Sequence, residues 1–489
     1  MKKILSLILA LVMALSLVAC GKKDETPDPV EDEQKPEGTV EVVWWTNYGD
    51  KNISYLQKTI DAFNANQSDY HVTIEYQGSA AELKAKVQST AQADLPALFN
   101  SSVQSVGICA DADYCAPLQQ FVDADTEGWP ELDATYASLR ASYTDGNGNL
   151  IGYPNGYSYG GVYYNADLLK EAGIDPASLK TVDDIYNACE TLVKGGHCTY
   201  GIGFHDSGFY FNAMLGREGV KLYDAGNGYE GRVENCLYES DSTVNTAVTD
   251  LLSFYQKLYA NKLAIPYGSN YQSEIIPQMA SGDCAMFVGV VSMTTKLLTS
   301  IEGKFELGIM PLPSVTADGK RTGEPAGGTG IFICDNGDKW AMQGAYEFIK
   351  FMSKAEYAAD FAASTGYLAP SSVAYESDVY QNYLTNVFPG VSTVYESLAN
   401  SDDSARNPFV GFASEMEAAN KQAVETVAND ANANDRWVAT FPEPIMATFI
   451  PRPFLLFLPA IGRYLNGSSP TADEIHQMVC WAALYNQNQ

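Results

Sequence analysis

The chain has 489 residues, of which 46% are hydrophobic, enough to fill the cores of two domains. It carries 60 acidic against 30 basic residues, a net charge of −30, and this excess argues against nucleic acid as a partner. It also weakens the case for a strongly anionic ligand, whereas 31 tyrosines and six tryptophans supply amphipathic rings suited to the C–H face of a sugar.

The first twenty residues predict export. Lys2 and Lys3 precede an apolar run over residues 4–18 that is too short to span a bilayer comfortably. The string Leu-Val-Ala-Cys-Gly at residues 17–21 resembles a bacterial lipobox, which implies that Cys20 is lipidated and becomes the mature N-terminus. The alternative is a cleaved secretory signal in which Cys20 is incidental.

A tether is predicted behind this signal peptide. Residues 21–38 are rich in Asp, Glu, Lys and Pro and contain almost no bulky apolar side chain. Such a segment cannot bury enough surface to offset its ordering entropy, so we expect it to be disordered. The two segments together predict a body held by lipid on the extracytoplasmic face of the cell membrane.

The body begins with alternating strand and helix patterns. Residues 40–45 form a buried-strand pattern, and Asn52 can cap a helix whose apolar positions 53, 56, 60 and 63 share one face. A second strand is predicted over residues 71–76 and a second helix over residues 80–93, with Leu83 and Val87 facing inward. This alternation is typical of an α/β protein with a mostly parallel sheet, which binds ligands beyond the carboxyl ends of its strands.

Two local features have alternative readings that concern metals and disulfides. The oxygen-bearing run Asp145–Asn149 resembles the start of a calcium loop, but Gly156 stands where a bidentate Glu is needed, so we interpret the run as a hairpin turn. Cys109 with Cys115, and Cys189 with Cys198, are plausible local disulfides in an exported protein, although all could be thiols. No paired CxxC spacing occurs, so we expect no metal site.

Three long segments resemble a known family. The segment GNLIGYPNGYSYGGVYYNADLLKEAGID (148–175) is similar to the place where sugar-binding proteins of ABC importers first cross between lobes. SEIIPQMASGDCAMFVGVVSMTTKLL (273–298) and AGGTGIFIC…STGYLAPSSVA (326–374) match later blocks in the same order. Together with the first strand, they make the chain similar to family 1 extracellular solute-binding proteins.

This resemblance implies an α/β, two-lobe periplasmic-binding-protein-like (type II) fold with a multi-segment hinge. The first lobe would comprise residues 39–153 and 327–368, and the second residues 154–326 and 369–435. A sugar or oligosaccharide that touches both lobes would favour closure, and the loaded monomer would dock on a membrane permease. The resemblance implies no bond chemistry and no cofactor.

The resemblance also implies that the ligand is held by loop residues that face the gap between the lobes. Aromatic rings would stack on a sugar, hydroxyls would bond its rim, and glycines would present bare backbone amides. The Glu expected in the loop after residue 99 in the glycerol-3-phosphate branch is missing, which argues against that substrate. The candidate ligand-binding residues are Trp44, Trp45, Tyr48, Ser101, Ser102, Gln104, Ser158, Tyr159, Tyr210, Phe211, Ser292, Gly327, Gly328, Tyr367 and Arg406.

Two other classes of protein compete with this interpretation. Residues 156–160 fit the GxSxG pattern of a secreted serine hydrolase with Ser158 as nucleophile, but an apparent strand at residues 162–164 follows where a helix is required. A purely adhesive surface lipoprotein is the third possibility, and it predicts no response to small molecules.

The end of the chain departs from the pattern. Residues 413–435 predict a final helix, but residues 436–489 carry three Arg against two Glu and one Asp, a net charge of zero. Arg452 and several prolines argue against a membrane span in the apolar run there. Either this atypical tail packs on the second lobe or it arises from an altered reading frame, and we expect it to pack poorly.

Overall fold

The computed structural model describes residues 35–238, 240–316, 325–399, 401 and 405–429. The chain divides into two units, Met1–Thr39 and Val40–Gln489, and the fold below is that of the second. Cys20, nearly all of the predicted tether and the tail after residue 429 lie outside the described residues. In the described part, no helix has both the length and the apolar character needed to cross a membrane.

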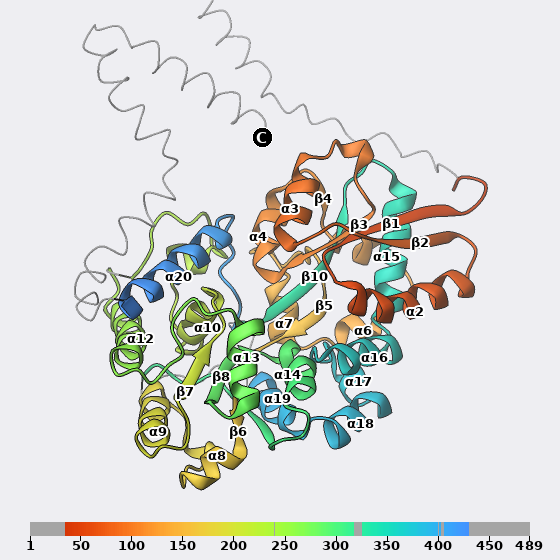
Figure 1. Cartoon of the computed structure of the whole chain (residues 1–489). Helices are drawn as coiled ribbons and strands as arrows, with labels where there is room; N and C mark the ends of the chain where they lie inside the picture. Colours follow the sequence, from red (N-terminus) through yellow and green to blue (C-terminus); the bar gives the residue numbers. More distant parts are fainter. Residues whose placement is uncertain (1–34, 239, 317–324, 400, 402–404, 430–489) are drawn as a thin grey trace, which may run out of the picture. The chain divides into compact units, whose positions relative to one another are not determined.

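The first sheet has six strands and begins with β1, the first element of the described body (Figure 1). Its order is β2-β1-β3-β10-β4, with β5 paired to the same side of β10 as β4. The pairs of β1 with β2 and β3 are parallel, whereas β10 runs antiparallel to β3, β4 and β5. The strands are β1 (Val40–Thr46), β2 (Tyr70–Tyr76), β3 (Leu98–Ser102), β4 (Cys115–Ala116), β5 (Tyr153–Ser158) and β10 (Gly327–Cys334).

The longer helices cover this sheet because they present an apolar stripe to it. In α2 the buried residues Leu56, Ile60 and Phe63 recur at helical spacing, as the sequence predicts. The helix is capped by Gly49, so Asn52 lies inside its first turn and the predicted cap is wrong. The helices on this side are α2 (Asp50–Asn66), α3 (Ala80–Ser89), α4 (Val106–Asp111), α5 (Gln119–Ala124), α6 (Pro130–Asp133), α7 (Ala137–Ser142), α15 (Lys339–Met352) and α16 (Ala355–Thr365).

The second sheet has four strands in the order β7-β8-β6-β9, and β6 runs antiparallel to both of its neighbours. Its strands are β6 (Gly160–Asn165), β7 (Tyr200–Phe204), β8 (Cys284–Val290) and β9 (Leu307–Pro311). Its helices are α8 (Ala166–Glu171), α9 (Val182–Lys194), α10 (Phe209–Arg217), α11 (Asp224–Asn227), α12 (Ser242–Ala260), α13 (Ile276–Ser281) and α14 (Thr294–Ile301). The chain passes from the first sheet to the second between β5 and β6, at Tyr159.

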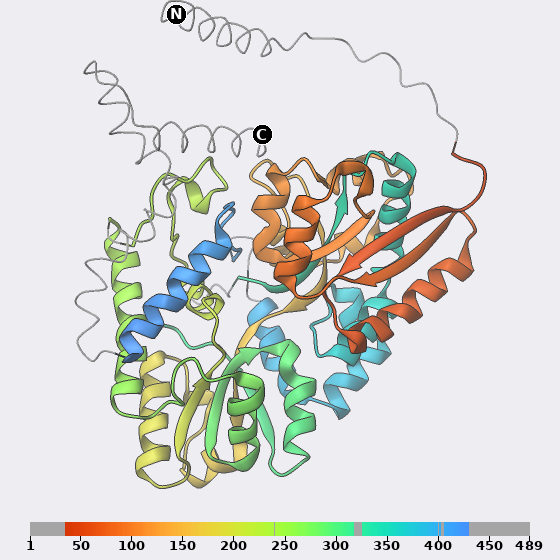
Figure 2. The same cartoon turned by 45° about the horizontal axis from the view of Figure 1, so that its top comes forward.

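The last described helices pack on elements that precede them in the chain. Helix α20 (Ala413–Asn429) packs along α12 and also contacts α10 (Figure 2), so the final helix predicted by the sequence is present up to residue 429. The helices α17 (Ser372–Tyr375), α18 (Asp378–Asn386) and α19 (Ser392–Ala399) connect α16 to this region, and α19 packs on β9.

Two expectations about local structure have clear outcomes. The run at residues 145–149 is a hairpin turn: Thr144 bridges Leu150, and Asp145 Oδ1 accepts hydrogen bonds from the amides of Asn147 and Asn149. Cys109, Cys115, Cys189 and Cys198 are free thiols in the structure, one of the two states that the sequence leaves open. The Cys115 thiol lies within hydrogen-bonding reach of Cys109.

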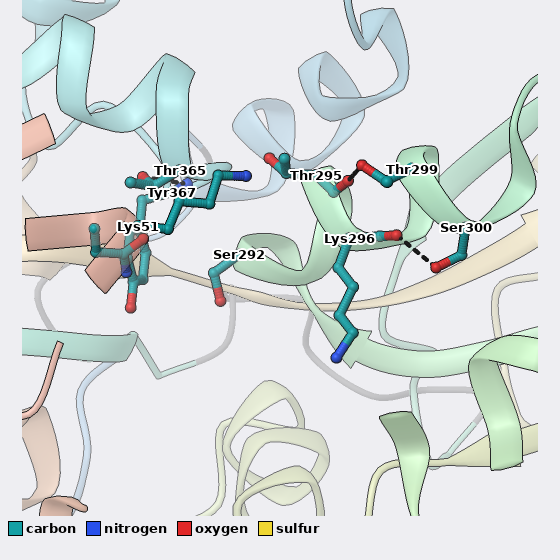
Figure 3. Close-up of a pocket in the computed structure, with 9 residues that line it drawn as sticks. Lys51, Ser292, Thr295, Lys296, Thr299, Ser300, Thr365 and Tyr367 are labelled. Carbon is teal, nitrogen blue, oxygen red and sulfur yellow. Dashed lines mark hydrogen bonds between the residues drawn. The ribbon is translucent and has the colours of Figure 1, made fainter. Parts of the chain in front are cut away.

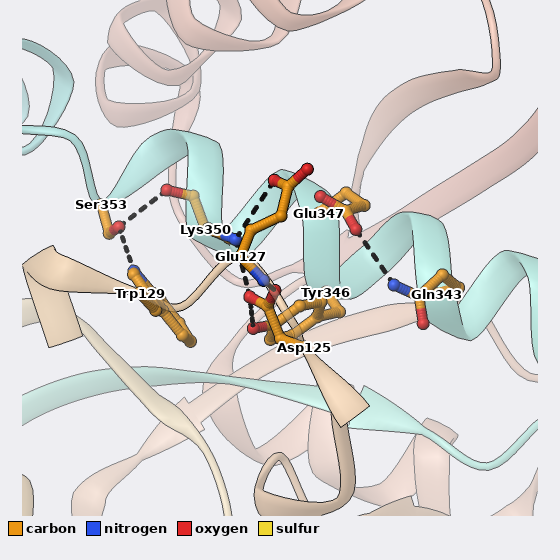
Figure 4. A network of polar contacts seen from close by, with 8 residues as sticks. All are labelled: Asp125, Glu127, Trp129, Gln343, Tyr346, Glu347, Lys350 and Ser353. Atoms are coloured by element: carbon orange, nitrogen blue, oxygen red, sulfur yellow. Dashed lines mark hydrogen bonds and ion pairs between the residues drawn. The ribbon is translucent and has the colours of Figure 1, made fainter. Parts of the chain in front are cut away.

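A buried ion pair holds the loop after α5 against α15 (Figure 4). Lys350 Nζ lies 2.6 Å from Asp125 Oδ2, and the two side chains are only 18% and 8% exposed. Tyr346 donates its hydroxyl to the same oxygen at 2.7 Å. Beside them, Trp129 Nε1 donates to Ser353 Oγ at 2.8 Å. This network fixes α15, whose other side packs on β1 and β10.

Candidate functional site

A cavity near the predicted site has a volume of about 530 Å³ and is lined by residues from three separate segments. Figure 3 shows side chains of α2 and of the α16 end on one side and those of α14 on the other. The lining residues are Lys51, Asn52, Ser292, Thr295, Lys296, Thr299, Ser300, Thr365 and Tyr367.

The topology places this cavity at the carboxyl ends of two strands. Strand β1 leads through residues 47–49 into α2, which supplies Lys51. Strand β8 leads through a short 3-10 turn at residues 291–293 into α14, which supplies Thr295 and Lys296. Loops at the carboxyl ends of strands in open α/β sheets are the usual place for a ligand.

Tyr367 forms a wall of the cavity, and contacts with Phe361, Tyr48 and Tyr380 fix its position. Its ring stacks on Phe361 with centroids 5.8 Å apart and meets Tyr48 edge-on at 6.5 Å. Its carbonyl oxygen accepts a hydrogen bond from the Tyr380 hydroxyl at 3.3 Å. Burial raises the pKa of Tyr367 above its ordinary value, so the phenol stays neutral and can donate a hydrogen bond at neutral pH.

Ser292 lies where the two sheets meet. Its Oγ accepts from Ser158 Oγ across 3.5 Å, and its amide donates to the same Ser158 oxygen at 3.4 Å. Ser158 ends β5 in the first sheet, and Ser292 follows β8 in the second. The serine pair therefore links the two halves beside the crossing at Tyr159.

The lining is rich in hydrogen-bond donors and poor in acids. Five Ser and Thr hydroxyls, one Tyr, one Asn and two Lys line the cavity, and no carboxylate is among these residues. Among the described residues, neither Lys51 nor Lys296 makes an ion pair. The Lys296 ammonium lies 5.6 Å from the centre of the Tyr271 ring, and desolvation lowers the pKa of Lys296.

The predicted residues divide into those that reach this cavity and those that do not. Ser292 and Tyr367 line it, and Ser158 bonds to Ser292 directly behind it. Ser101 and Ser102 pair with Gly330 and Thr329 along β10. Gln104 lies in the short 3-10 helix after β3, away from the cavity lining.

The predicted aromatic residues Trp44, Trp45 and Tyr48 do not line this cavity. Trp44 is fully buried against Phe348, so it belongs to the core. Trp45 is 8% exposed, and its ring is covered by the Lys86 ammonium at 3.8 Å. Tyr48 is buried behind Tyr367 and supports that wall rather than forming it.

The predicted residues of α10 and of the first crossing also lie outside this cavity lining. Tyr210 and Phe211 are 3% and 1% exposed and pack in the core of the second half. Their neighbour Phe209 approaches Gly327, where an added Cβ would lie 3.0 Å from its ring. Tyr159 is buried, and its hydroxyl bonds to Ser401 at 3.1 Å.

Gly328 and Arg406 have structural explanations of their own. Gly328 has a φ of +102°, and a Cβ there would overlap the Gly156 carbonyl, so glycine is required by the close approach of β5. The Arg406 guanidinium stacks on Tyr229 at 3.4 Å and lines a different cavity of about 340 Å³. Neither residue lines the cavity of Figure 3.

Sequence reasoning missed most of the lining residues. Lys51 and Asn52 lie in the first turn of α2, whereas the sequence indicates the aromatic residues just before that helix. Thr295, Lys296, Thr299 and Ser300 show a polar face at helical spacing on α14, a pattern that also fits a solvated helix. Thr365 is two residues before Tyr367 in the segment that the resemblance had already marked.

The hydrolase alternative does not fit this geometry. The residues after Ser158 form strand β6 rather than a helix, so the strand–turn–helix of a nucleophile elbow is not formed. The Ser158 hydroxyl bonds to Ser292 and not to a histidine. Within the described ranges, no group of three or more His, Cys, Asp or Glu residues is placed to hold a metal ion.

The two sheets, the crossing between them and the cavity at the strand ends define the class of a two-lobed, type II binding protein. A family model described as a bacterial extracellular solute-binding protein matches residues 58–386. The chain therefore belongs to the family of bacterial extracellular solute-binding proteins, which act outside the cytoplasm.

Relatives in sequence are distant but extensive. The chain is 24% identical over 399 residues to the sn-glycerol-3-phosphate-binding periplasmic protein UgpB of Yersinia pestis bv. Antiqua (strain Antiqua), a match that covers 80% of this chain and 86% of that protein. It is 25% identical over 357 residues to UgpB of Escherichia coli (strain K12), covering 71% and 78%.

Solved structures show the same fold. A cyclic alpha-maltosyl-1,6-maltose binding protein from Arthrobacter globiformis superposes with a TM-score of 0.67 at 19% identity, covering 84% of this chain and 99% of that one. UgpB from Mycobacterium tuberculosis in complex with glycerophosphocholine gives a TM-score of 0.66 at 17% identity, covering 85% and 99%.

Proposed function

We propose that this protein captures a sugar or oligosaccharide between two hinged lobes and delivers it unaltered to an ABC permease. The observation that carries the proposal is the cavity of about 530 Å³ lined by hydroxyl, amide and ammonium donors beside the Tyr367 ring. A sugar presents many hydroxyls around an apolar ring face, so it matches donors at the rim and an aromatic wall.

The lobes that we propose follow the two sheets. The first would hold residues 39–153 and 327–368, and the second residues 154–326 and 369–435. Strand β5 pairs with β10 as far as Ser158, which moves the first crossing about five residues later than that division. Closure would be favoured because a ligand contacts Lys51 and Tyr367 on one side and Ser292 and α14 on the other.

A second candidate ligand is a phosphate ester of a small polyol. Two observations favour it: Lys51 and Lys296 line the cavity without ion-pair partners among the described residues, and the UgpB relatives bind sn-glycerol 3-phosphate. The chain's net charge of −30 and the missing Glu after β3 weigh against it. Both candidates are ligands rather than substrates of a reaction.

A thermal-shift panel tests the proposal. We expect a neutral oligosaccharide at 100 times its dissociation constant to add about 2.7 kcal/mol to the free energy of unfolding. Each ligand that shifts the melting temperature is then recovered and analysed by mass spectrometry, and it should be chemically unchanged. The panel also contains glycerol 3-phosphate and galactose. If no sugar and no phosphate ester shifts the melting temperature, the proposal is wrong.

We also propose that Cys20 is lipidated and anchors a monomer to the extracytoplasmic face of the membrane. Two acyl chains hold a protein on a bilayer because each buried CH₂ contributes about 0.8 kcal/mol. Cells that express the wild-type chain should retain it in the membrane fraction and release it with detergent. The Cys20→Ser variant should be secreted in soluble form, and membrane retention of that variant would contradict the lipid anchor.

A further inference from the structure

Six of the seven cysteines in the described part of the chain fall into two groups of three, one at each sheet. The first group is Cys109, Cys115 and Cys334, and the second is Cys189, Cys198 and Cys284. The thiols within each group lie close together, and burial raises the pKa of Cys115, Cys334, Cys189 and Cys284. The ligand cavity uses none of them.

The first group contains a pair that the sheet itself aligns. Cys115 in β4 lies directly opposite Cys334 in β10, in antiparallel register. The Asp335 amide donates to the Tyr114 carbonyl at 3.0 Å, one residue outside the pair on each strand. The cysteines therefore form a non-hydrogen-bonded pair, the arrangement in which facing Cα atoms are about 4.5 Å apart and the side chains are closest.

That separation suits a disulfide. Disulfides join Cα atoms about 4.4–6.8 Å apart, with Cβ atoms about 3.5–4.5 Å apart. Strand β4 has only two residues and lies at the edge of the sheet, so it can adjust by the small distance that bond formation needs. In the second group, no two cysteines face each other in a strand pair, because Cys189 is on a helix, Cys198 is in a loop and Cys284 pairs with Tyr200.

We propose that Cys115 and Cys334, which are thiols in this structure, form a disulfide in the exported protein, bracing β4 against β10. The family acts outside the cytoplasm, where disulfides form and persist. Strand β10 carries Gly327 and Gly328 at its other end, beside Ser158 and Phe209, so the brace holds a strand that reaches the crossing between the sheets.

Oxidation requires a low-molecular-weight disulfide, or a protein disulfide, as the oxidant. The Cys115 thiolate attacks one sulfur of that disulfide and releases one thiol, and the Cys334 sulfur then displaces the second. The two cysteines lose two protons and two electrons. The oxidant takes up these protons and electrons and becomes two thiols. Both cysteines are nearly inaccessible in the folded protein, so the exchange belongs to folding, before β4 is covered.

Cys109 is the competing partner, because its thiol lies within hydrogen-bonding reach of Cys115. A Cys109–Cys115 bond would close only a short turn, in which the Cys115 amide already donates to Ala112 and the Ala112 amide to Cys109. A Cys115–Cys334 bond closes a long loop, and longer loops gain more stability from a disulfide. The cross-strand pair is therefore the stable product at equilibrium.

Peptide mapping tests the proposal on the full chain. The exported protein is isolated without reductant, alkylated in denaturant and digested; a second sample is refolded with oxidised and reduced glutathione. We expect one peptide pair joining Cys115 to Cys334, and a melting temperature about 5 °C higher than after reduction. The Cys109→Ser variant should keep the link and the shift, whereas Cys334→Ser should lose both.

Two results would overturn the proposal. One is a Cys109–Cys115 peptide in the wild-type protein, and the other is alkylation of all three cysteines after refolding with oxidised glutathione. Cys236, which lies apart from both groups, is the matched control, because the Cys236→Ser variant should keep the Cys115–Cys334 link. The wild type and Cys109→Ser decide the question even if Cys334→Ser fails to fold.

Discussion

Replacing Tyr367 by alanine is expected to weaken ligand binding about tenfold. The substitution removes a neutral hydroxyl donor, worth about 0.5–1.5 kcal/mol, and an aromatic wall worth a similar amount. Together these amount to about 1–3 kcal/mol, a range that includes the roughly 1.4 kcal/mol of a tenfold change in affinity. Isothermal titration with the ligand found in the thermal-shift panel measures the effect.

Two further variants separate the ring from its hydroxyl. Tyr367→Phe keeps the wall stacked on Phe361, so it should lose only the hydroxyl contribution and bind better than Tyr367→Ala. Tyr76 is 56% exposed and does not line the cavity, so Tyr76→Ala should bind like the wild type. Unchanged affinity in a folded Tyr367→Ala protein would show that the cavity of Figure 3 is not the ligand site.

Replacing Lys350 by methionine is expected to lower the free energy of unfolding at pH 7 by about 3 kcal/mol. The methionine fills the space of the lysine stem, but it leaves the Asp125 carboxylate buried without its cation (Figure 4). The carboxylate then depends on the Tyr346 hydroxyl and the Glu127 amide alone. Urea unfolding followed by circular dichroism measures the change.

The effect should depend on pH in a defined direction. Burial raises the pKa of Asp125, but the Lys350 and Tyr346 hydrogen bonds and the Glu127 amide outweigh it and lower the pKa to about 2. A lowered pKa stabilises the fold above the unfolded value of about 3.9 and loses that contribution as the pH falls toward 2. The difference between wild type and Lys350→Met should therefore shrink below pH 4.

A surface ion pair provides the control for this variant. Lys58 lies 3.7 Å from Asp360, with both side chains substantially exposed at 64% and 43%. Exposed pairs of this kind contribute about 0–1 kcal/mol. Lys58→Met should therefore change stability much less than Lys350→Met, and equal losses would argue that Asp125 is solvated in solution.

The local sequence pattern predicts a helix where one face of that helix is buried. The stripe Leu56, Ile60 and Phe63 indicated α2, and Leu83 and Val87 indicated α3, because a helix of this size buries one side at a spacing of 3.6 residues. The end of α3 came four residues earlier than predicted, because Thr90 adopts an extended backbone conformation that local periodicity does not reveal.

The sequence indicates which segments lie near the cavity, but not which of their residues line it. Ser292 and Tyr367, two of the predicted residues, line the cavity, because the resemblance marks whole segments that lie near the crossings. Trp44 and Trp45 lie outside the cavity lining, because a tryptophan beside a strand looks the same in the sequence whether it faces a ligand or α15. Lys296 is not among the predicted residues, because a polar face on a short helix predicts exposure to solvent and not the neighbour across the cavity.

The amino-acid sequence alone determined the α/β class, the order of the strands and helices along the chain, and the similarity to solute-binding proteins, since these depend on local periodicity and on contiguous motifs. Only the tertiary structure decided which donors line one cavity and which thiols face each other. Lys51 and Ser292, like Cys115 and Cys334, are separated by more than two hundred residues and meet only through the folding of distant segments. The spacing of residues along the chain does not predict such contacts, because packing and strand pairing between distant segments produce them.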